Sequence, residues 1–195
     1  MERDARQQFI DVFMAKNAQL NLSAIRDADG IFVKHVCDAL EVTKIPELVW
    51  QREGKHVIDV WTWWWIPLLP LAITFQDTTF IWLDSVRKKT EAVEDMTKKL
   101  WCTNVSVLWS RAEDHHVEYD ILTARAMAFS DTLFNWTFHL VKKGWLFILY
   151  KMFSEEEEAR LDSYVMQRKM TMLRKHYYKL FDDDIQRVMY VIKKG

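Results

Sequence analysis

Short apolar segments alternate with amphipathic segments along most of this chain, and this alternation limits the choice of fold more than any other feature. The segments expected to be buried strands are 57–60, 79–83, 105–108, 119–123, 145–150 and 188–192. The segments expected to be helices are 2–18, 30–43, 68–75, 86–100, 128–141 and one that begins after residue 154. Strands that alternate with helices form a mostly parallel sheet with helices on both faces. The sequence therefore predicts an α/β, doubly wound, mostly parallel sheet with N-terminal helices.

Two local signals refine this prediction. Ser154 followed by Glu157 matches a capping box, which predicts a helix start, and the acidic run 155–158 suits the positive end of that helix. We interpret this run as a solvated helix start. Lys142-Lys143-Gly144 predicts a turn before the strand at 145–150.

The 195 residues suit one domain with a small appendage, and we divide them into an N-terminal helical segment, 1–45, and an α/β domain, 46–195. The net charge is −1, so the whole molecule is not an obvious binder of polyanions. Residues 160–195 nevertheless carry a net charge of +5 and residues 1–159 one of −6. The two cysteines, Cys37 and Cys102, give neither a disulfide framework nor metal-ligand spacing.

Targeting signals do not stand out. The first six residues are too charged for a secretory signal, so we expect a cytoplasmic protein. Residues 60–75 are nearly all apolar, but these 16 residues contain Pro67 and Pro70, and a membrane-spanning helix needs about 20 residues. Tryptophan favours membrane interfaces, yet no basic amphipathic face accompanies this segment. A buried strand, a turn and a helix are expected there instead.

Polar side chains follow the predicted strands at their carboxyl ends, where ligands of parallel sheets bind. Asp59 lies at the end of the first strand and Asp84 follows the second, 25 residues later. In nucleotide-binding sheets a carboxylate at the second position commonly holds ribose hydroxyls. Residues 111–114 and Arg125 follow the next two strands. This arrangement indicates an adenosine-type cofactor, although Asp84 at a strand end is equally typical of a helix N-cap.

Six ordered segments with preserved spacing resemble the RsmG (GidB) family of bacterial small-subunit ribosomal RNA guanine-N7 methyltransferases. They are 21–27 (N-L-S-A-I-R-D), 33–40 (V-K-H-V-C-D-A-L), 83–85 with Lys88, 110–113 (S-R-A-E), 123–126 (T-A-R-A) and 186–193 (Q-R-V-M-Y-V-I-K). The resemblance covers nearly the whole chain. It implies a Rossmann-like class I methyltransferase fold, S-adenosyl-L-methionine as the cofactor, and small-subunit ribosomal RNA or the ribosomal subunit as the partner of a monomer.

The resemblance also implies roles for particular residues. The cofactor-binding candidates are Asp59, Trp61, Ile66, Asp84, Ala112, Glu113 and Arg125. The RNA-binding candidates are Arg26, Lys34 and His35, for which structural pairing with Asp27 and Asp38 is the alternative. Guanine N7 is already a nucleophile, so methyl transfer needs in-line positioning more than a base, and no catalytic residue is assigned. His115-His116 is interpreted as an exposed turn, without a metal.

One segment departs from the family pattern. The cofactor loop of the family reads G-[TS]-G-x-G-[FL]-P-G, whereas residues 61–68 read W-T-W-W-W-I-P-L. Trp101, Trp145 and Met152 also stand where the family frequently has glycine. The chain holds 4 Gly and 10 Trp, where an average composition of about 7% Gly predicts roughly 13 Gly.

Tryptophan at a glycine position is strained at φ > 0 and fills space that the ligand needs. We therefore expect Trp61, Trp63, Trp64 and Trp65 to impair cofactor binding. One explanation is that UGA codons translated here as Trp are read as Gly in the organism, which leaves Leu68 and Met152 unexplained. The other is a catalytically dead or engineered scaffold whose cofactor pocket is filled.

Overall fold

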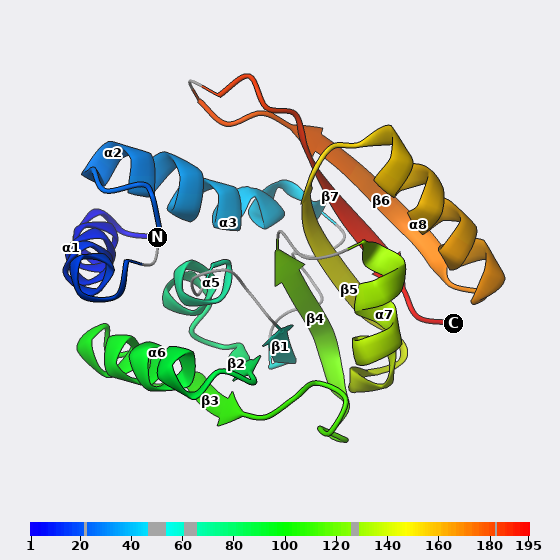
Figure 1. Ribbon diagram of the computed structural model, residues 1–195, viewed down its shortest axis with the longest axis horizontal. Helices are drawn as coiled ribbons and strands as arrows, with labels where there is room; N and C mark the ends of the chain where they lie inside the picture. Colours follow the sequence, from blue (N-terminus) through cyan, green and yellow to red (C-terminus); the bar gives the residue numbers. More distant parts are fainter. Residues whose placement is uncertain (22, 47–53, 61–65, 126–128, 182) are drawn as a thin grey trace.

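A central twisted sheet organises the molecule (Figure 1). The computed structural model describes residues 1–21, 23–46, 54–60, 66–125, 129–181 and 183–195. In this part of the chain the sheet has seven strands in the order β3-β2-β1-β4-β5-β7-β6. Strands β1 to β5 are parallel, and β7 is antiparallel to both β5 and β6. The α/β, doubly wound, mostly parallel sheet predicted from the sequence is confirmed.

The strands have the following bounds: β1 His56–Val60, β2 Thr79–Asp84, β3 Val105–Trp109, β4 Tyr119–Arg125, β5 Val141–Met152, β6 Thr171–Tyr178 and β7 Arg187–Lys193. The α-helices are α1 Arg3–Leu20, α2 Ala28–Ile31, α3 Asp38–Leu40, α5 Leu68–Thr74, α6 Arg87–Lys99, α7 Ser130–Thr137 and α8 Glu155–Gln167. Shorter helical turns are η1 Phe32–Cys37, η2 Glu41–Lys44 and η4 Phe138–Leu140.

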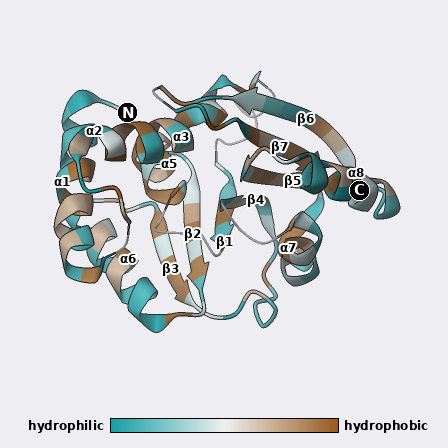
Figure 2. Cartoon of the chain, turned by 45° about the horizontal axis from the view of Figure 1, so that its top comes forward, coloured by the Kyte–Doolittle hydropathy of each residue, from teal (hydrophilic) through white to brown (hydrophobic). Residues whose placement is uncertain are grey.

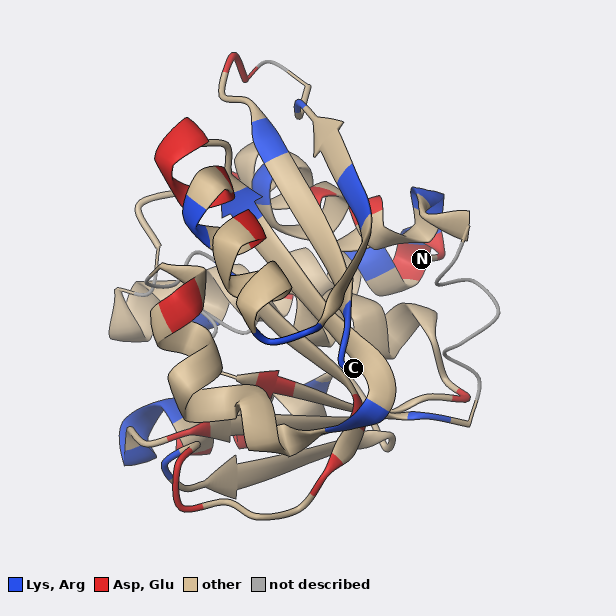
Figure 3. Cartoon of the chain, turned by 90° about the vertical axis from the view of Figure 1, so that its right-hand side faces the viewer, with Lys and Arg blue, Asp and Glu red and all other residues tan. Residues whose placement is uncertain are grey.

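Helices cover both faces of the sheet, and the period of two along each strand supplies a core for each face. On β4, Ile121 joins a core with helices α1, α5 and α6, whereas its neighbour Leu122 joins a second core with α7 and α8. Trp82 and Leu83 of β2 divide between the two cores in the same way. Brown segments on the inner strands in Figure 2 follow these cores, and Figure 3 shows the side covered by α8.

The N-terminal helices share the first core with the α/β part. Phe9 and Phe13 of α1 are fully buried there together with Val93 of α6. Gln8 Nε2 donates to the carbonyl of Lys99 at 3.0 Å across the same interface. The helix expected over 30–43 is confirmed as helical, but its middle is the π-helical turn η1 and its end the 3-10 turn η2.

The turn expected at Lys142–Gly144 is wrong, because these residues lie inside β5. The register between β4 and β5 shifts there, from Tyr119 opposite Val141 to Ile121 opposite Leu146. Gly144 has φ +81°, and its N–H donates to the carbonyl of Lys194 at 2.9 Å. Pairing with the end of β7 thus carries the strand through an irregularity that the local sequence signals as a turn.

The chain also forms β6, a strand that the sequence pattern does not indicate. It is an edge strand, with mostly exposed or half-buried residues that include Arg174 and Lys175. Among the described helices, none is long and apolar enough to cross a membrane. The apolar segment 60–75 contributes α5, a seven-residue helix whose first five residues are buried.

Candidate functional site

A cleft lies at the carboxyl ends of β1, β2 and β3. It holds about 270 Å³ of space, open solvent at its mouth included. The residues that line it are Val60, Leu83, Asp84, Ser85, Ser110, Arg111, Ala112 and Glu113. The structure thus brings together three of the predicted cofactor-binding residues, Asp84, Ala112 and Glu113, from two segments of the chain.

Asp84 is the buried carboxylate of this cleft. Its Oδ1 accepts a hydrogen bond from the N–H of Val86 at 2.8 Å, and Lys89 Nζ lies 3.3 Å from Oδ2. Helix α6 begins at Arg87. Its N-cap residue is Val86, whose side chain makes no capping hydrogen bond. Asp84 therefore closes a turn before the helix rather than serving as its N-cap. Since a carboxylate offers about four acceptor positions, Asp84 can still accept hydrogen bonds from the hydroxyl groups of a ligand.

The turn after β3 forms the opposite wall. Ala112 is buried and Glu113 is exposed, and the turn is closed by hydrogen bonds from the N–H groups of Asp114 and His115. The N–H of Ser110 donates to the carbonyl of Asp84 at 3.2 Å, which holds this turn against the end of β2. The small side chain of Ala112 and the buried carboxylate of Asp84 thus line the same cleft.

Asp59 lies near the end of β1 and is fully buried. Thr123 Oγ1 donates to its Oδ2 at 2.5 Å, whereas Oδ1 has no hydrogen-bond partner among the described residues. Burial raises the pKa of Asp59 well above its usual value, and the Thr123 hydroxyl and the charge of Arg125 oppose this effect. Asp59 itself is not among the residues that line the cleft, although its neighbour Val60 is.

Arg125 joins the end of β4 to the N-terminal helices. Its Nε lies 2.8 Å from Asp38 Oδ2, and its Nη2 donates to the carbonyl of Lys34 at 2.9 Å. Asp38 is buried and also accepts a hydrogen bond from the Tyr178 hydroxyl at 2.8 Å. Arg125 is not among the residues that line the described cleft, and its contacts instead fix how α3 sits on the sheet.

The three predicted RNA-binding residues have different environments. Arg26 is exposed and donates to Asn21 Oδ1 at 2.5 Å, and Lys34 is exposed. His35 is buried, with its Nε2 3.3 Å from Ser23 Oγ and its ring centroid 5.0 Å from that of Phe13. Burial, assisted by the charge of Arg125, lowers the pKa of His35 to about 4. Arg26 and Lys34 can therefore reach a partner, whereas His35 is packed inside.

The alternative was that these residues pair with Asp27 and Asp38. In the structure both aspartates have other partners. Asp27 Oδ1 accepts a hydrogen bond from the N–H of Gly30 at 2.7 Å, at the start of α2. Asp38 takes Arg125 and Tyr178 as partners. Trp61, Trp63, Trp64 and Trp65 lie outside the described residues. Ile66 is buried in the first core and is not among the residues that line the cleft.

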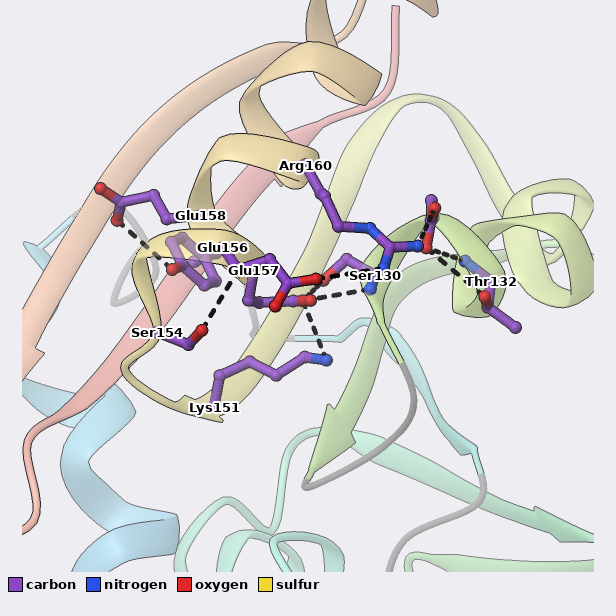
Figure 4. A network of polar contacts seen from close by, with 10 residues as sticks. Ser130, Thr132, Lys151, Ser154, Glu156, Glu157, Glu158 and Arg160 are labelled. Atoms are coloured by element: carbon purple, nitrogen blue, oxygen red, sulfur yellow. Dashed lines mark hydrogen bonds and ion pairs between the residues drawn. The ribbon is translucent and has the colours of Figure 1, made fainter.

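A buried ion pair at the end of β5 was not expected from the sequence (Figure 4). Glu157 is 5% exposed, and its Oε1 lies 3.0 Å from Lys151 Nζ and accepts hydrogen bonds from the N–H of Ser130, at 3.1 Å, and from the Ser130 hydroxyl. The interpretation of run 155–158 as solvated is therefore wrong for Glu157. The Ser154 cap itself is confirmed, since Ser154 Oγ accepts from the N–H of Glu157.

This cluster joins three elements at one end of the sheet. Lys151 belongs to β5, Ser130 begins α7, and Glu157 lies in the first turn of α8. It thereby ties the start of α7 and the first turn of α8 to the end of β5. The capping-box signal located Glu157 in the sequence, but no local signal indicated its burial. Within the described residues, no group of three or more His, Cys, Asp or Glu side chains has a metal-binding arrangement.

Comparison with known proteins gives a consistent result. A family model described as "GidB: rRNA small subunit methyltransferase G" matches residues 3–185. A curated relative from Hydrogenovibrio crunogenus, named Ribosomal RNA small subunit methyltransferase G, is 36% identical over 151 residues, which are 76% of this chain and 67% of that protein.

Solved structures with the same fold are more distant in sequence. A putative RNA methyltransferase from Pyrococcus horikoshii has a TM-score of 0.62 at 13% identity and covers 80% of this chain and 83% of its own. TYW2 from M. jannaschii, solved in complex with AdoMet, has a TM-score of 0.59 at 13% identity, with 81% and 77% covered. The chain spans about half the length of others, such as aTrm5 in complex with tRNALeu, at 46%. These likenesses support the Rossmann-like fold alone.

Proposed function

The chain belongs to the GidB family, and from that premise we propose that it is an S-adenosylmethionine-dependent methyltransferase that modifies guanine N7 of small-subunit ribosomal RNA. The observation that carries the proposal is the cleft at the carboxyl ends of β1 to β3, where buried Asp84 faces the turn of Ala112 and Glu113. Ligands of doubly wound sheets bind at this edge.

The described walls of the cleft fit the adenosine half of the cofactor. Asp84 accepts hydrogen bonds from ribose hydroxyls, while Ala112 and Glu113 frame the adenine ring. Asp59, near the end of β1, has a buried Oδ1 without a hydrogen-bond partner among the described residues, but it does not line the cleft. S-adenosylmethionine supplies a methyl group on a positively charged sulfur. Guanine N7 carries its own lone pair, so the protein has to orient the two reactants rather than remove a proton.

A second function rests on the tryptophan loop, namely that the chain as printed keeps the fold and binds no cofactor. The described structure holds one observation that bears on it. Trp101 adopts φ +54° directly after α6, at a position where helices commonly end in glycine. Trp101 thus stands at a glycine-type position in the backbone as well as in the family pattern, although Asn21 and Lys169 adopt the same conformation after α1 and α8.

The test compares two chains in a calorimetric titration with S-adenosylmethionine. One is the printed sequence, verified by intact mass, and the other carries Trp61→Gly, Trp63→Gly and Trp65→Gly. We expect micromolar binding by the glycine variant and binding at least tenfold weaker by the printed chain, because three indole side chains are removed from the loop. Asp84→Asn in the glycine variant is the matched control and should weaken binding.

Each outcome separates the two functions. Codons TGA at these positions, with binding only by the glycine variant, favour a recoded methyltransferase, and methylation of small-subunit RNA is then assayed on that variant. Codons TGG with the same binding result favour an inactive printed chain. If neither folded chain binds the cofactor, the methyltransferase proposal is wrong. Equal binding by both would mean that the loop does not obstruct the cleft.

A further inference from the structure

Seven cationic side chains gather at the edge of the sheet opposite the cofactor cleft. They belong to the segment before β1, the start of β5, the turn from α8 to β6 and the end of β7. These residues, called the basic edge below, are Lys55, Lys142, Lys143, Arg168, Lys169, Lys193 and Lys194. In Figure 3 blue segments surround the C-terminus. Because β1, β4 and β5 are parallel and β7 is antiparallel to both β5 and β6, with Thr171 opposite Lys193, these four places fall on the same side.

Aromatic rings under the cations hold this surface together. Lys55 Nζ lies 4.6 Å from the ring centroid of Trp145, and Lys194 Nζ lies 4.6 Å from that of Phe138. The Arg168 guanidinium lies 5.3 Å from the Tyr164 ring. Lys194 Nζ also donates to the carbonyls of residues 138 and 141, at 3.0 and 2.6 Å. The fold therefore positions the cationic groups of Lys55, Arg168 and Lys194.

The positive charge of the basic edge is not neutralised within the protein. In the described part of the chain its ion pairs are Lys142 with Asp120, at 2.8 Å, and Lys194 with Glu118, at 4.0 Å. Lys143, Lys169 and Lys193 are exposed. Seven cations against two carboxylates contrast with a net charge of −1 for the whole chain. Concentrated like charges repel one another, and a polyanion relieves this repulsion with release of its counterions.

We propose that the basic edge binds the phosphate backbone of structured RNA at a distance from the nucleotide that enters the cleft. This inference rests on the proposed function and extends it to a second contact surface. Strands of five to seven residues separate the two edges by about 20 Å. RNA that engages both must therefore be large and folded, which selects an assembled RNA over a short strand.

An RNA backbone suits this surface better than a membrane does. Phe138, Trp145 and Tyr164 are half-buried beneath the cations, whereas a membrane-bound face inserts its aromatic side chains into the lipid. The cations come from separate turns and form a broad surface rather than one amphipathic helix. Folded RNA is recognised largely through its shape and its phosphates, which such a surface matches.

The experiment measures the dissociation constant for transcribed small-subunit ribosomal RNA as a function of salt. The test variant carries Lys143→Gln, Lys169→Gln and Lys193→Gln, which remove exposed cations outside the ion pairs described. The control carries Lys44→Gln, Lys98→Gln and Lys99→Gln, which remove the same charge from exposed lysines that pair with Glu41, Glu94 and Asp95. Cofactor binding and thermal unfolding are measured on all three proteins.

We expect the test variant to bind RNA at least tenfold more weakly near physiological salt. The slope of log K against log salt should fall by about 2 to 3, since each phosphate contact contributes about 0.7 to 0.9. The control should retain the slope of the parent, and a short hairpin that contains only the target region should be bound equally by all three. Cofactor affinity should not change, because the substituted residues lie at the other edge.

Several results would overturn the inference. Equal slopes for test and control variants would mean that only overall charge matters. A parent protein that binds no ribosomal RNA would also refute the basic edge, whatever the cofactor titration gives. Loss of binding to anionic vesicles, with RNA binding intact, would assign the surface to a membrane. Failure of the proposed cofactor chemistry is recognised separately, because RNA affinity and its slope are measured without cofactor.

Discussion

Individual residues set properties that the fold as a whole does not reveal. His35 is the sharpest example, because burial lowers its pKa to about 4, from an ordinary value of 6.5. Between these two values the unfolded chain binds a proton that the folded chain does not, so the free energy of unfolding falls as the pH is lowered from 6.5 to 4. The expected loss is about 3 kcal/mol at the acid limit, and the term is constant above pH 6.5.

The measurement is urea unfolding of the parent and of His35→Gln between pH 4.5 and 7.5. The parent should lose about 2 to 3 kcal/mol more than the variant over this range. All other titrating groups are common to both proteins, so their contributions cancel in the difference. Identical pH dependence would show that His35 is not buried in its neutral form.

Trp101 has a strained backbone conformation. It is 80% exposed, adopts φ +54°, and follows a helix end closed by a hydrogen bond from the N–H of Cys102 to the carbonyl of Thr97 at 3.0 Å. Trp101→Gly should raise the free energy of unfolding by about 1 kcal/mol, since glycine has no Cβ to strain there. Trp109→Gly, inside β3, should lower it. Thermal unfolding of both variants shows whether the sign of the stability change depends on the backbone conformation or on the loss of the indole side chain.

At the scale of elements, the buried Lys151–Glu157 pair explains how α7 and α8 are fixed to the end of β5. Glu157→Gln removes the carboxylate charge from the buried pair with Lys151 and should lower the free energy of unfolding by about 3 to 5 kcal/mol. Glu157→Gln combined with Lys151→Met should recover part of this loss. The matched control is Glu156→Gln, one position earlier, where an exposed side chain contributes within about 1 kcal/mol. Similar losses in both single variants would argue against a buried pair.

At the scale of the whole molecule, the N-terminal helices belong to the core of the sheet. Phe9, Phe13 and Ile31 share a buried cluster with Leu69 and Val93. We expect residues 46–195, expressed alone, to expose this apolar face and to lose cooperative unfolding, although the sequence pattern places a boundary at residue 45. Calorimetry and hydrogen exchange on the truncated chain test this, and a sharp native-like transition would contradict it.

The sequence by itself determined the features that depend on local periodicity. Apolar runs separated by amphipathic segments specified the strands β1 to β5 and β7, most of the helices between them and hence a mostly parallel sheet, whereas the strand order came from the structure. Because carboxyl ends of parallel strands meet at one edge, the positions of Asp84, Ala112 and Glu113 along the chain were enough to place them in one cleft.

Only the tertiary structure decided which distant residues meet. The local pattern predicts that Glu157 is solvated, but Lys151 and Ser130 contact it in the interior. Arg125 ends β4 and pairs with Asp38, 87 positions earlier. The basic edge likewise gathers cations from four separate segments. Such partners leave no period in the sequence, because their interaction energy arises only when the packed sheet excludes water and brings them within a few ångströms. Local pattern selects the elements, and packing selects the contacts among them.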